Sequence, residues 1–169
     1  MKNKKKAVFL DRDGTINYDY KYVHKFKNFK FRKNVIKGLK LLYNKKYLIF
    51  IVTNQAGIAK GKFKVSDLRI LHKKLINYLK KKKIIISKIE YCPYHPKGII
   101  KKYKKRTNYR KPGNMMIKKI LRKWNIDIKK SFMLGDKLSD KQAANKTGLY
   151  FEYVKNDFYL QIKKISQKY

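Results

Sequence analysis

Short apolar runs alternate with longer amphipathic segments along most of the chain. The apolar runs at 7–10, 47–53, 84–91, 131–135 and 149–154 have the length and composition of buried strands. Between them, residues 34–44, 66–82, 114–124 and 138–146 carry apolar side chains at helical spacing. Ser66 and Asp67 predict a helix start, and Gly148 predicts a helix stop. This alternation predicts an α/β fold, a mainly parallel sheet flanked by helices on both faces.

Length and composition predict one globular domain spanning residues 1–169. A hydrophobic fraction of 43% supports a real core and excludes global disorder. The single cysteine, Cys92, excludes an internal disulfide framework and is typical of a reducing compartment. No apolar run approaches the roughly 18 residues of a membrane span, and the basic start resembles no signal peptide. We therefore expect a cytoplasmic protein, a monomer, with no membrane partner.

The positive charge of the chain has two interpretations. Forty-seven Lys and Arg residues against ten Asp and Glu residues give a net charge of +37, which attracts nucleic acid at long range. The charge is spread from Lys2 to Lys168, however, and Lys, Ile, Asn, Tyr and Phe are abundant together, as under AT-rich codon usage. We favour the compositional interpretation and expect no nucleic-acid partner. A small anionic substrate would be attracted in either case.

Four of the ten acids form two close pairs, each directly after an apolar run. Asp11 and Asp13 lie in the sequence Asp-Arg-Asp-Gly-Thr, and residues two apart in an extended segment face the same way. Such a pair suits a divalent metal, or a nucleophile beside a general acid/base, and Gly14 allows a sharp turn. The alternative is an ordinary Asp/Gly turn. Asp136 follows Gly135, and Asp140 is one helical turn on, either an exposed acid or a brace to a lysine.

Two polar segments add candidate ligands for an anion. Thr53, Asn54 and Gln55 follow the second apolar run, where their donors are suited to phosphoryl oxygens. An ordinary polar strand end is an equally good interpretation of these three residues alone. Arg110 and Lys111 precede Pro112 and supply cations, although two cations among so many prove nothing by themselves.

Four motifs in this order resemble the pattern of the haloacid dehalogenase superfamily: Asp-x-Asp-Gly-Thr, a threonine after the second strand, a lysine, and the acid pair in Gly-Asp-x-x-x-Asp. The segments FLDRDGTIN, D-x-x-Y-V-H at 19–24, TNQAGIAKGKF, CPYHP, RKP and GDKLSDKQAA are similar to those of the D-glycero-D-manno-heptose 1,7-bisphosphate phosphatases. They resemble the histidinol-phosphate phosphatases slightly less well. The resemblance covers nearly the whole chain in collinear order. It implies a Rossmann-like sheet without a large cap domain.

The resemblance also implies roles for individual residues. Asp11 would be the nucleophile that forms an aspartyl-phosphate, and Asp13 the general acid and then the base. Thr53 and Lys111 would stabilise the transferring phosphoryl group. Mg²⁺ would be held by Asp11, Asp136 and the backbone carbonyl of Asp13, a sparse oxygen set that suits this ion. The implied reaction releases the C7 phosphate of the heptose bisphosphate and leaves heptose 1-phosphate.

Further residues are implied in substrate binding. Asn54 would assist the phosphoryl group beside Gln55, and Arg110 would bind the far end of the substrate. The segment from Asp19 to Tyr22 would contact the sugar. Tyr20 and Lys21 stand there in place of the usual His-Gly, a difference that bears on sugar specificity.

Many relatives hold the loop before Arg-Lys-Pro with a structural zinc ion. In this chain only Cys92 and His95 remain as possible ligands, because Tyr94, Thr107 and Tyr109 occupy the other expected positions. A closed zinc site needs four ligands, so we expect no zinc. Packing of tyrosines and prolines would hold the loop instead, namely Tyr91, Tyr94, Tyr103, Tyr109, Pro93 and Pro96.

Two rival functions remain open. A polynucleotide 3′-phosphatase is favoured by the segment 109–112, Tyr-Arg-Lys-Pro, and by the charge, but segments 19–24, 92–96 and 135–144 resemble the sugar phosphatases. A basic nucleic-acid-binding module without catalysis is the second. The chain carries no zinc-finger, RNA-recognition or helix-turn-helix signature for it, and it would leave the catalytic set unexplained.

Overall fold

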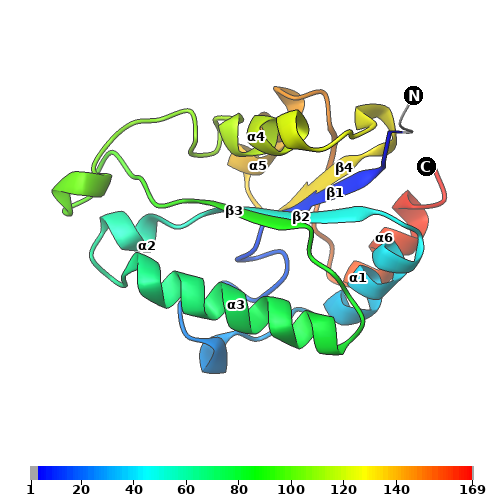
Figure 1. The fold of residues 1–169 in the computed structure, drawn as a ribbon, viewed down its shortest axis with the longest axis horizontal. Coiled ribbons are helices and arrows are strands. Elements are labelled where there is room, and N and C mark those ends of the chain that lie inside the picture. The colour runs from blue at the N-terminus through cyan, green and yellow to red at the C-terminus, as the bar shows by residue number, and fades with distance from the viewer. Residues whose placement is uncertain (1–3, 169) are drawn as a thin grey trace.

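A five-stranded parallel sheet forms the centre of the molecule in the computed structural model, which describes residues 4–168 (Figure 1). The strands are β1 Ala7–Leu10, β2 Leu48–Asn54, β3 Lys88–Cys92, β4 Phe132–Gly135 and β5 Tyr150–Tyr153. Their order across the sheet is β3-β2-β1-β4-β5, and every pairing is parallel. The predicted α/β class is therefore confirmed.

Helices cover both faces of this sheet, as the alternation predicts (Figure 1). On one face lie α1 Val35–Asn44, α3 Val65–Lys81 and α6 Phe158–Ile165, and on the other α4 Met115–Lys123 and α5 Leu138–Asn145. A short helix, α2 Ala56–Ala59, follows β2 directly. The described residues also form three single-turn 3₁₀ helices: η1 Phe26–Asn28, η2 Lys101–Tyr103 and η3 Ile128–Lys130.

The strand side chains divide the core into two clusters. In β1, Val8 and Leu10 face the cluster with α1, α3 and α6, whereas Ala7 and Phe9 face the cluster with α4 and α5. This division follows from the two-residue period of a strand, and it explains why strands covered on both faces are continuously apolar. The central strands β1 and β4 are buried throughout.

The structure corrects several expected element boundaries. The expected strand 84–91 is a strand only from Lys88, because Ile84 and Ile86 fill the core from the connection that leaves α3. The helix expected from Ser66 begins at Val65, and Asp67 accepts a hydrogen bond from the Lys64 backbone N–H. β5 was expected to be buried, but as an edge strand it is half-exposed.

Helix α6 is absent from the sequence prediction. Its eight residues begin after Asp157, whose side chain accepts a hydrogen bond from the Leu160 N–H. Phe158 packs on α1 at Gly38, where an added Cβ would lie 2.4 Å from its ring. Tertiary contact with α1 therefore stabilises a helix too short to stand out in the sequence.

The topology brings three strand ends together. The chain starts at β1, adds β2 and β3 on one side, and then returns to add β4 and β5 on the other. Ligands of such sheets bind at this switch point, beyond the carboxyl ends of the strands. Asp11, Thr53 and Asp136 lie at the ends of β1, β2 and β4.

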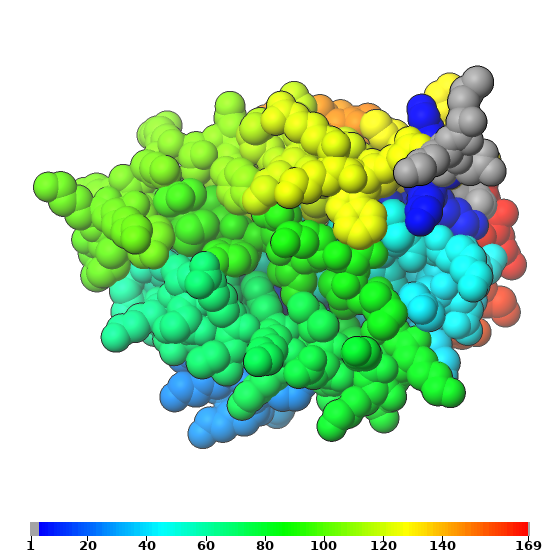
Figure 2. Space-filling view, viewed as in Figure 1, coloured from blue at the N-terminus to red at the C-terminus, as the bar shows by residue number. Residues whose placement is uncertain are grey.

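The segment 93–114 is a long connection that contains no α-helix. It carries η2 and projects from one end of the molecule (Figures 1 and 2). Ile99 on this projection is 76% exposed. The segment then returns to the strand ends at Arg110 and Lys111. Within residues 4–168, no helix combines the length and apolarity needed to cross a membrane.

Candidate active site

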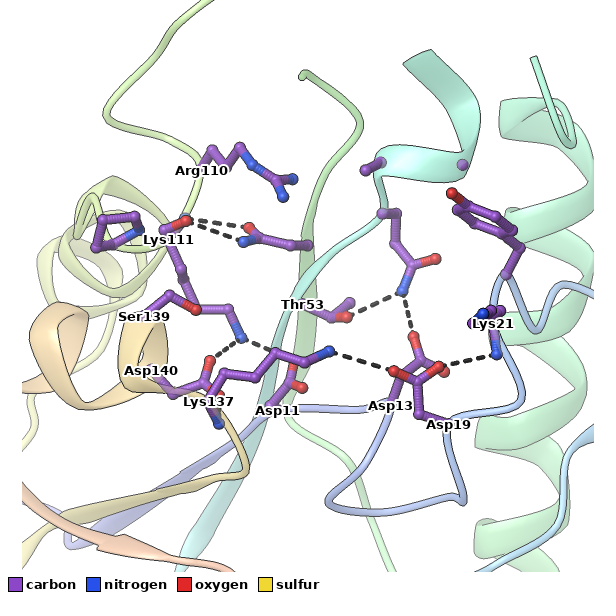
Figure 3. A pocket seen from close by; sticks show the side chains of 16 residues that line it. Asp11, Asp13, Asp19, Lys21, Thr53, Arg110, Lys111, Lys137, Ser139 and Asp140 are labelled. Atoms are coloured by element: carbon purple, nitrogen blue, oxygen red, sulfur yellow. Dashed lines mark hydrogen bonds and ion pairs between the residues drawn. The ribbon is translucent and has the colours of Figure 1, made fainter. Parts of the chain in front are cut away.

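A cavity of about 530 Å³ opens at the carboxyl ends of the strands (Figure 3). Every site residue predicted from the sequence lines it except Asp136. Lys21 lies within the predicted sugar-contact segment 19–22, whereas the sequence analysis did not single out Pro112, Lys137 and Ser139 as site residues. The lining set is Asp11, Asp13, Asp19, Lys21, Tyr22, Thr53, Asn54, Gln55, Ala56, Gly57, Arg110, Lys111, Pro112, Lys137, Ser139 and Asp140.

Lys111 is the buried cation of this cavity. Its Nζ lies 2.7 Å from Asp11 Oδ1 and 2.6 Å from Asp140 Oδ1, and it donates to the Val52 carbonyl at 2.7 Å. Burial alone would lower the pKa of Lys111, but the two carboxylates outweigh it and raise the pKa above 10.5. The amine is therefore charged and oriented at the strand ends.

Asn54 holds the backbone of Lys111. Its Nδ2 donates to the Lys111 carbonyl at 3.0 Å, and its Oδ1 accepts from the Lys111 N–H at 3.1 Å. Both polar ends of the amide are thus engaged with the chain. In this arrangement Asn54 positions Lys111, whereas the resemblance implied direct help to the phosphoryl group.

Asp11 is a buried acid at the base of the cavity. Burial raises its pKa to about 7, against the attraction of Lys111, and the nearby Asp140 carboxylate adds to the rise. Asp11 also lies at the end of the central strand β1, where its N–H donates to the Leu134 carbonyl at 3.0 Å. Its carboxylate is therefore fixed in direction and poorly solvated, as a nucleophile requires.

Asp11, Asp136 and Asp140 form a group that fits a divalent cation. One ligand oxygen from each lies within 4.8 Å of the others. Asp136 Oδ1 is buried and has no hydrogen-bond partner among the described residues, whereas Asp140 is engaged by Lys111 and by the Lys137 N–H at 3.0 Å. An unpartnered buried carboxylate oxygen beside a second carboxylate is typical of a site for a hard cation such as Mg²⁺.

Two glycines make room for these carboxylates. A Cβ on Gly14 would lie 2.3 Å from Asp136 Oδ2, and one on Gly135 would lie 2.4 Å from Asp140 Cβ. Gly14 also has a φ of +89°, which other residues rarely adopt. Asp140 is only 1% exposed and contacts Lys111, so the interpretation of Asp140 as an exposed helical acid is wrong and the lysine brace is confirmed.

Asp13 faces a different set of partners. Its carboxylate accepts hydrogen bonds from Arg12, from Asn17 Nδ2 at 2.9 Å and from Gln55 Nε2 at 2.8 Å. Burial would raise the pKa of Asp13, but the Arg12 guanidinium and these donors hold it below 3.8. Gln55 Nε2 also donates to Thr53 Oγ1 at 2.9 Å. Gln55 therefore ties Asp13 to Thr53 across the cavity.

Arg12 and His72 are site-supporting residues that the sequence analysis missed. Arg12 is fully buried and donates to the Val23 carbonyl at 2.6 Å, while its Nη1 lies 3.2 Å from His72 Nε2. The signal was present, since an arginine stands between the two paired acids. A buried guanidinium with a fork of donors fixes the direction of the Asp13 carboxylate.

We expect His72 to impose an acid-dependent loss of stability. Burial, together with the charge of Arg12, lowers the pKa of His72 to about 3. The unfolded chain therefore binds more protons between about pH 3 and pH 6.5, so the free energy of unfolding falls as the pH falls through this window. The cost attributable to His72 at pH 5 is about 2 kcal/mol. Urea unfolding at pH 5 and pH 8 should show a smaller pH dependence for His72→Gln.

The matched control for this prediction is His24→Gln, because His24 is half-exposed and stacks on Phe63. Its pH dependence should follow that of the unmodified protein. Equal pH dependence in the His72 variant and the control would contradict the prediction.

The rim of the cavity carries the predicted sugar-contact segment. Asp19 Oδ2 lies 3.2 Å from Lys137 Nζ, which is 3.9 Å from Asp136 Oδ2, so Lys137 spans the opening (Figure 3). Tyr22 has a left-handed φ of 56°, and its hydroxyl accepts from Lys60 Nζ at 3.3 Å. Arg110 Nη1 contacts the Tyr94 carbonyl at 3.4 Å, and the side chain projects toward the cavity (Figure 3).

The loop expected to lack zinc is packed by aromatic rings. Tyr94 and Tyr103 are 6.1 Å apart between ring centroids, and Lys105 Nζ lies 4.0 Å from the Tyr94 centroid. Cys92 is fully buried in the core, and His95 Nδ1 accepts from the Lys97 N–H at 3.0 Å. The absence of zinc stays a prediction, which elemental analysis of protein purified without chelators or a metal-binding tag would check.

Comparison with known proteins identifies the family. A family model described as Polynucleotide kinase 3 phosphatase matches residues 6–164. The D-glycero-alpha-D-manno-heptose-1,7-bisphosphate 7-phosphatase of Photorhabdus laumondii is 42% identical over 87% of this chain and 80% of that protein. The D-glycero-beta-D-manno-heptose-1,7-bisphosphate 7-phosphatase of Escherichia coli K12 is 40% identical over 82% of this chain and 72% of that protein. The chain belongs to the heptose-bisphosphate 7-phosphatase family.

Solved structures agree with this family at the level of the fold. A D,D-heptose 1,7-bisphosphate phosphatase from B. bronchiseptica, complexed with magnesium and phosphate, superimposes with a TM-score of 0.85 at 23% identity. The match covers 97% of this chain and 99% of that chain. The resemblance stated from the motifs is confirmed, and the protein is a phosphoric monoester hydrolase.

Proposed function

We propose that this phosphatase hydrolyses the C7 phosphate of D-glycero-D-manno-heptose 1,7-bisphosphate and leaves heptose 1-phosphate, in the cytoplasm. The names of its relatives support this substrate. The observation that carries the chemistry is the contact between Lys111 Nζ and Asp11 at 2.7 Å, at the base of a cavity lined by donors. The names of the relatives include both anomers, so both are substrates to test.

In this mechanism an Asp11 carboxylate oxygen attacks the phosphorus of the C7 phosphate. A P–O bond forms to Asp11 while the bond to the sugar oxygen breaks, which gives an aspartyl-phosphate and a sugar hydroxyl. Lys111 and the Thr53 hydroxyl stabilise the negative charge on the phosphoryl oxygens. Water then attacks the phosphorus of the intermediate, releases inorganic phosphate and regenerates Asp11.

Asp13 handles the protons of both steps. It protonates the departing sugar oxygen in the first step and accepts a proton from the attacking water in the second. Its lowered pKa in the free site suits the second role directly. For the first role Asp13 must take up a proton as the anionic substrate enters, which opposes the field of Arg12.

The acid group supports Mg²⁺ as the cofactor. Asp11 and Asp136 would hold the ion, with the Asp13 carbonyl as a third ligand, because Asp136 Oδ1 is unpartnered among the described residues and Asp140 is engaged by Lys111. When bound, Mg²⁺ would neutralise charge on the phosphoryl oxygens. Lys111, which already contacts Asp11, would stabilise the phosphoryl group during transfer.

We expect Arg110 to bind the phosphate that is not hydrolysed. Lys111 is committed to Asp11, whereas the Arg110 guanidinium lines the cavity and, among the described residues, donates one long hydrogen bond of 3.4 Å to the Tyr94 carbonyl. Arg110→Ala should lower kcat/KM for the bisphosphate roughly 100-fold and for a heptose 7-monophosphate less than about 3-fold. Steady-state phosphate release measures both values.

The control is Arg106→Ala, which removes a neighbouring cation that does not line this cavity. It should leave both substrates nearly unchanged. Equal losses on the two substrates in Arg110→Ala would rule out this role for Arg110.

A phosphate-release screen tests the proposed function as a whole. It should include both heptose bisphosphate anomers, histidinol phosphate and a 3′-phosphorylated oligonucleotide. The oligonucleotide is the second candidate, supported by the description of the matching family model and by the charge of +37. Preference for the oligonucleotide over both heptose bisphosphates by kcat/KM would overturn the proposal.

A further inference from the structure

Tyr109 links the segment that carries Arg110 and Lys111 to two other elements. Its hydroxyl donates a hydrogen bond to Glu90 Oε2 on β3. Lys119 Nζ, on α4, lies 3.0 Å from the same carboxylate oxygen and 3.2 Å from the Tyr109 hydroxyl. Glu90 is 6% exposed and does not line the catalytic cavity.

We name the side chains of Tyr109, Glu90 and Lys119 the Tyr109 clamp. Each of the three makes a hydrogen bond or ion pair with the other two. Burial, followed by the hydrogen bond to Glu90, raises the pKa of Tyr109 to about 12, so its hydroxyl remains a donor. Lys119 supplies the opposite charge for Glu90 and lies 5.6 Å from the Tyr109 ring centroid. A buried carboxylate held by a hydroxyl and a cation makes a stiff anchor, because loss of either partner leaves it poorly compensated.

The segment between Tyr109 and Lys111 is itself tightly tied. The Tyr109 N–H donates to Thr107 Oγ1 at 3.1 Å, and the Arg110 N–H donates to the Thr107 carbonyl at 3.2 Å. Gly113 follows with an N–H···O bond to Arg110 at 2.7 Å, and a Cβ there would lie 2.1 Å from the Asn108 carbonyl. Movement of the Tyr109 side chain would therefore be transmitted along a short rigid segment to Lys111.

Lys111 is held from two sides in this arrangement. Asn54 fixes its backbone from β2, and the clamp fixes the residue two positions earlier from β3 and α4. We propose that Tyr109, Glu90 and Lys119 are positioning residues that aim the Lys111 amine at the phosphoryl group. The proposal rests on the role given above to Lys111, but it does not depend on which sugar the enzyme takes.

The test uses inorganic phosphate as the probe of Lys111, together with turnover. In Tyr109→Phe the ring still packs but the hydrogen bond to Glu90 is lost. We expect about 10-fold weaker phosphate binding by calorimetry in the presence of Mg²⁺, a similar loss of kcat, and little change in KM. The loss should be equal on the bisphosphate and on a monophosphate. Glu90→Gln, whose amide oxygen still accepts from Tyr109, should retain kcat and phosphate affinity within about 3-fold.

Tyr150→Phe is the matched control, because the Tyr150 hydroxyl donates to Glu152 at 2.6 Å on the exposed edge strand β5. It should change neither phosphate affinity nor kcat. Thermal unfolding of all variants separates positioning from folding. If Tyr109→Phe binds phosphate and turns over like the control, the clamp is overturned. The proposal is also overturned if the unfolded fraction of Tyr109→Phe accounts for its loss of kcat and phosphate affinity. It is overturned as well if the loss of kcat occurs only on the bisphosphate.

Failure of the proposed sugar specificity would appear differently. The substrate screen would then favour another phosphomonoester, while the phosphate affinities of the Tyr109 and Glu90 variants would still differ as described. If Lys111 itself had no catalytic role, Lys111→Met would retain kcat, whatever the clamp variants did.

Discussion

Asp11→Asn is expected to abolish phosphate release, with a loss of roughly 10⁴-fold or more in kcat. An amide cannot attack phosphorus as a carboxylate does. Among residues 4–168, the other carboxylate paired with Lys111 is Asp140, which the Lys137 N–H and Lys111 already engage. The fold should survive, because Asn has the size of Asp and Lys111 keeps Asp140 as its counter-ion. Phosphate release and the thermal unfolding temperature, measured on the same preparation, check both statements.

The chain offers a matched substitution for this test. Asp67→Asn makes the same chemical change at the start of α3, where an amide oxygen can still accept from the Lys64 N–H. It should leave kcat unchanged. More than a few per cent of the original activity in Asp11→Asn, without chemical reversion to Asp, would show that another residue is the nucleophile.

Asp136→Asn is expected to remove the response of the protein to Mg²⁺. In the metal-free protein, burial raises the pKa of Asp136 despite the attraction of Lys137. The nearby Asp140 carboxylate raises this pKa further. The substitution should therefore leave the metal-free protein as stable as before, or slightly more stable. At 100 times the dissociation constant, Mg²⁺ should stabilise the unmodified protein by about 2.7 kcal/mol. For a chain of this size that shifts the unfolding temperature by roughly 5–10 °C.

Thermal unfolding with and without Mg²⁺ measures this effect independently of turnover. The Asp136→Asn variant should show almost no shift and at least a 100-fold loss of kcat at the same Mg²⁺ concentration. Asp127→Asn serves as the control, since Asp127 accepts from the Lys129 N–H at η3, away from the acid group. An undiminished Mg²⁺ shift in Asp136→Asn would remove Asp136 from the metal site.

Local patterns in the sequence were sufficient for the strands β1, β2 and β4 and for the location of the cavity. Apolar runs mark β1, β2 and β4 because each is buried on both faces, and the polar residue after each run lies at a strand end. Because parallel strands end at the same edge, those residues had to meet there. For that reason the sequence alone marks the pairs Asp11/Asp13 and Asp136/Asp140 as candidate site residues.

Only the tertiary structure decided which cation each of these acids pairs with and which acids are buried. Asp11 and Asp13 are two residues apart, yet Asp11 pairs with Lys111, 100 residues away, whereas Asp13 pairs with Arg12. Asp140 could have been exposed, and it is buried because Gly135 lets α5 approach β4 closely. Such choices depend on the paths of loops and on the space that distant side chains leave, which no local period encodes.

The same reason applies to the cations. With forty-seven Lys and Arg residues in the chain, composition could not show that Lys111 and Arg12 are buried, although Arg12 stands between two paired acids. Both are stabilised in the interior because carboxylates from other elements compensate their charge. The sequence by itself determined which residue types reach the strand ends. Desolvation and charge pairing in the folded chain decided which of them are held together.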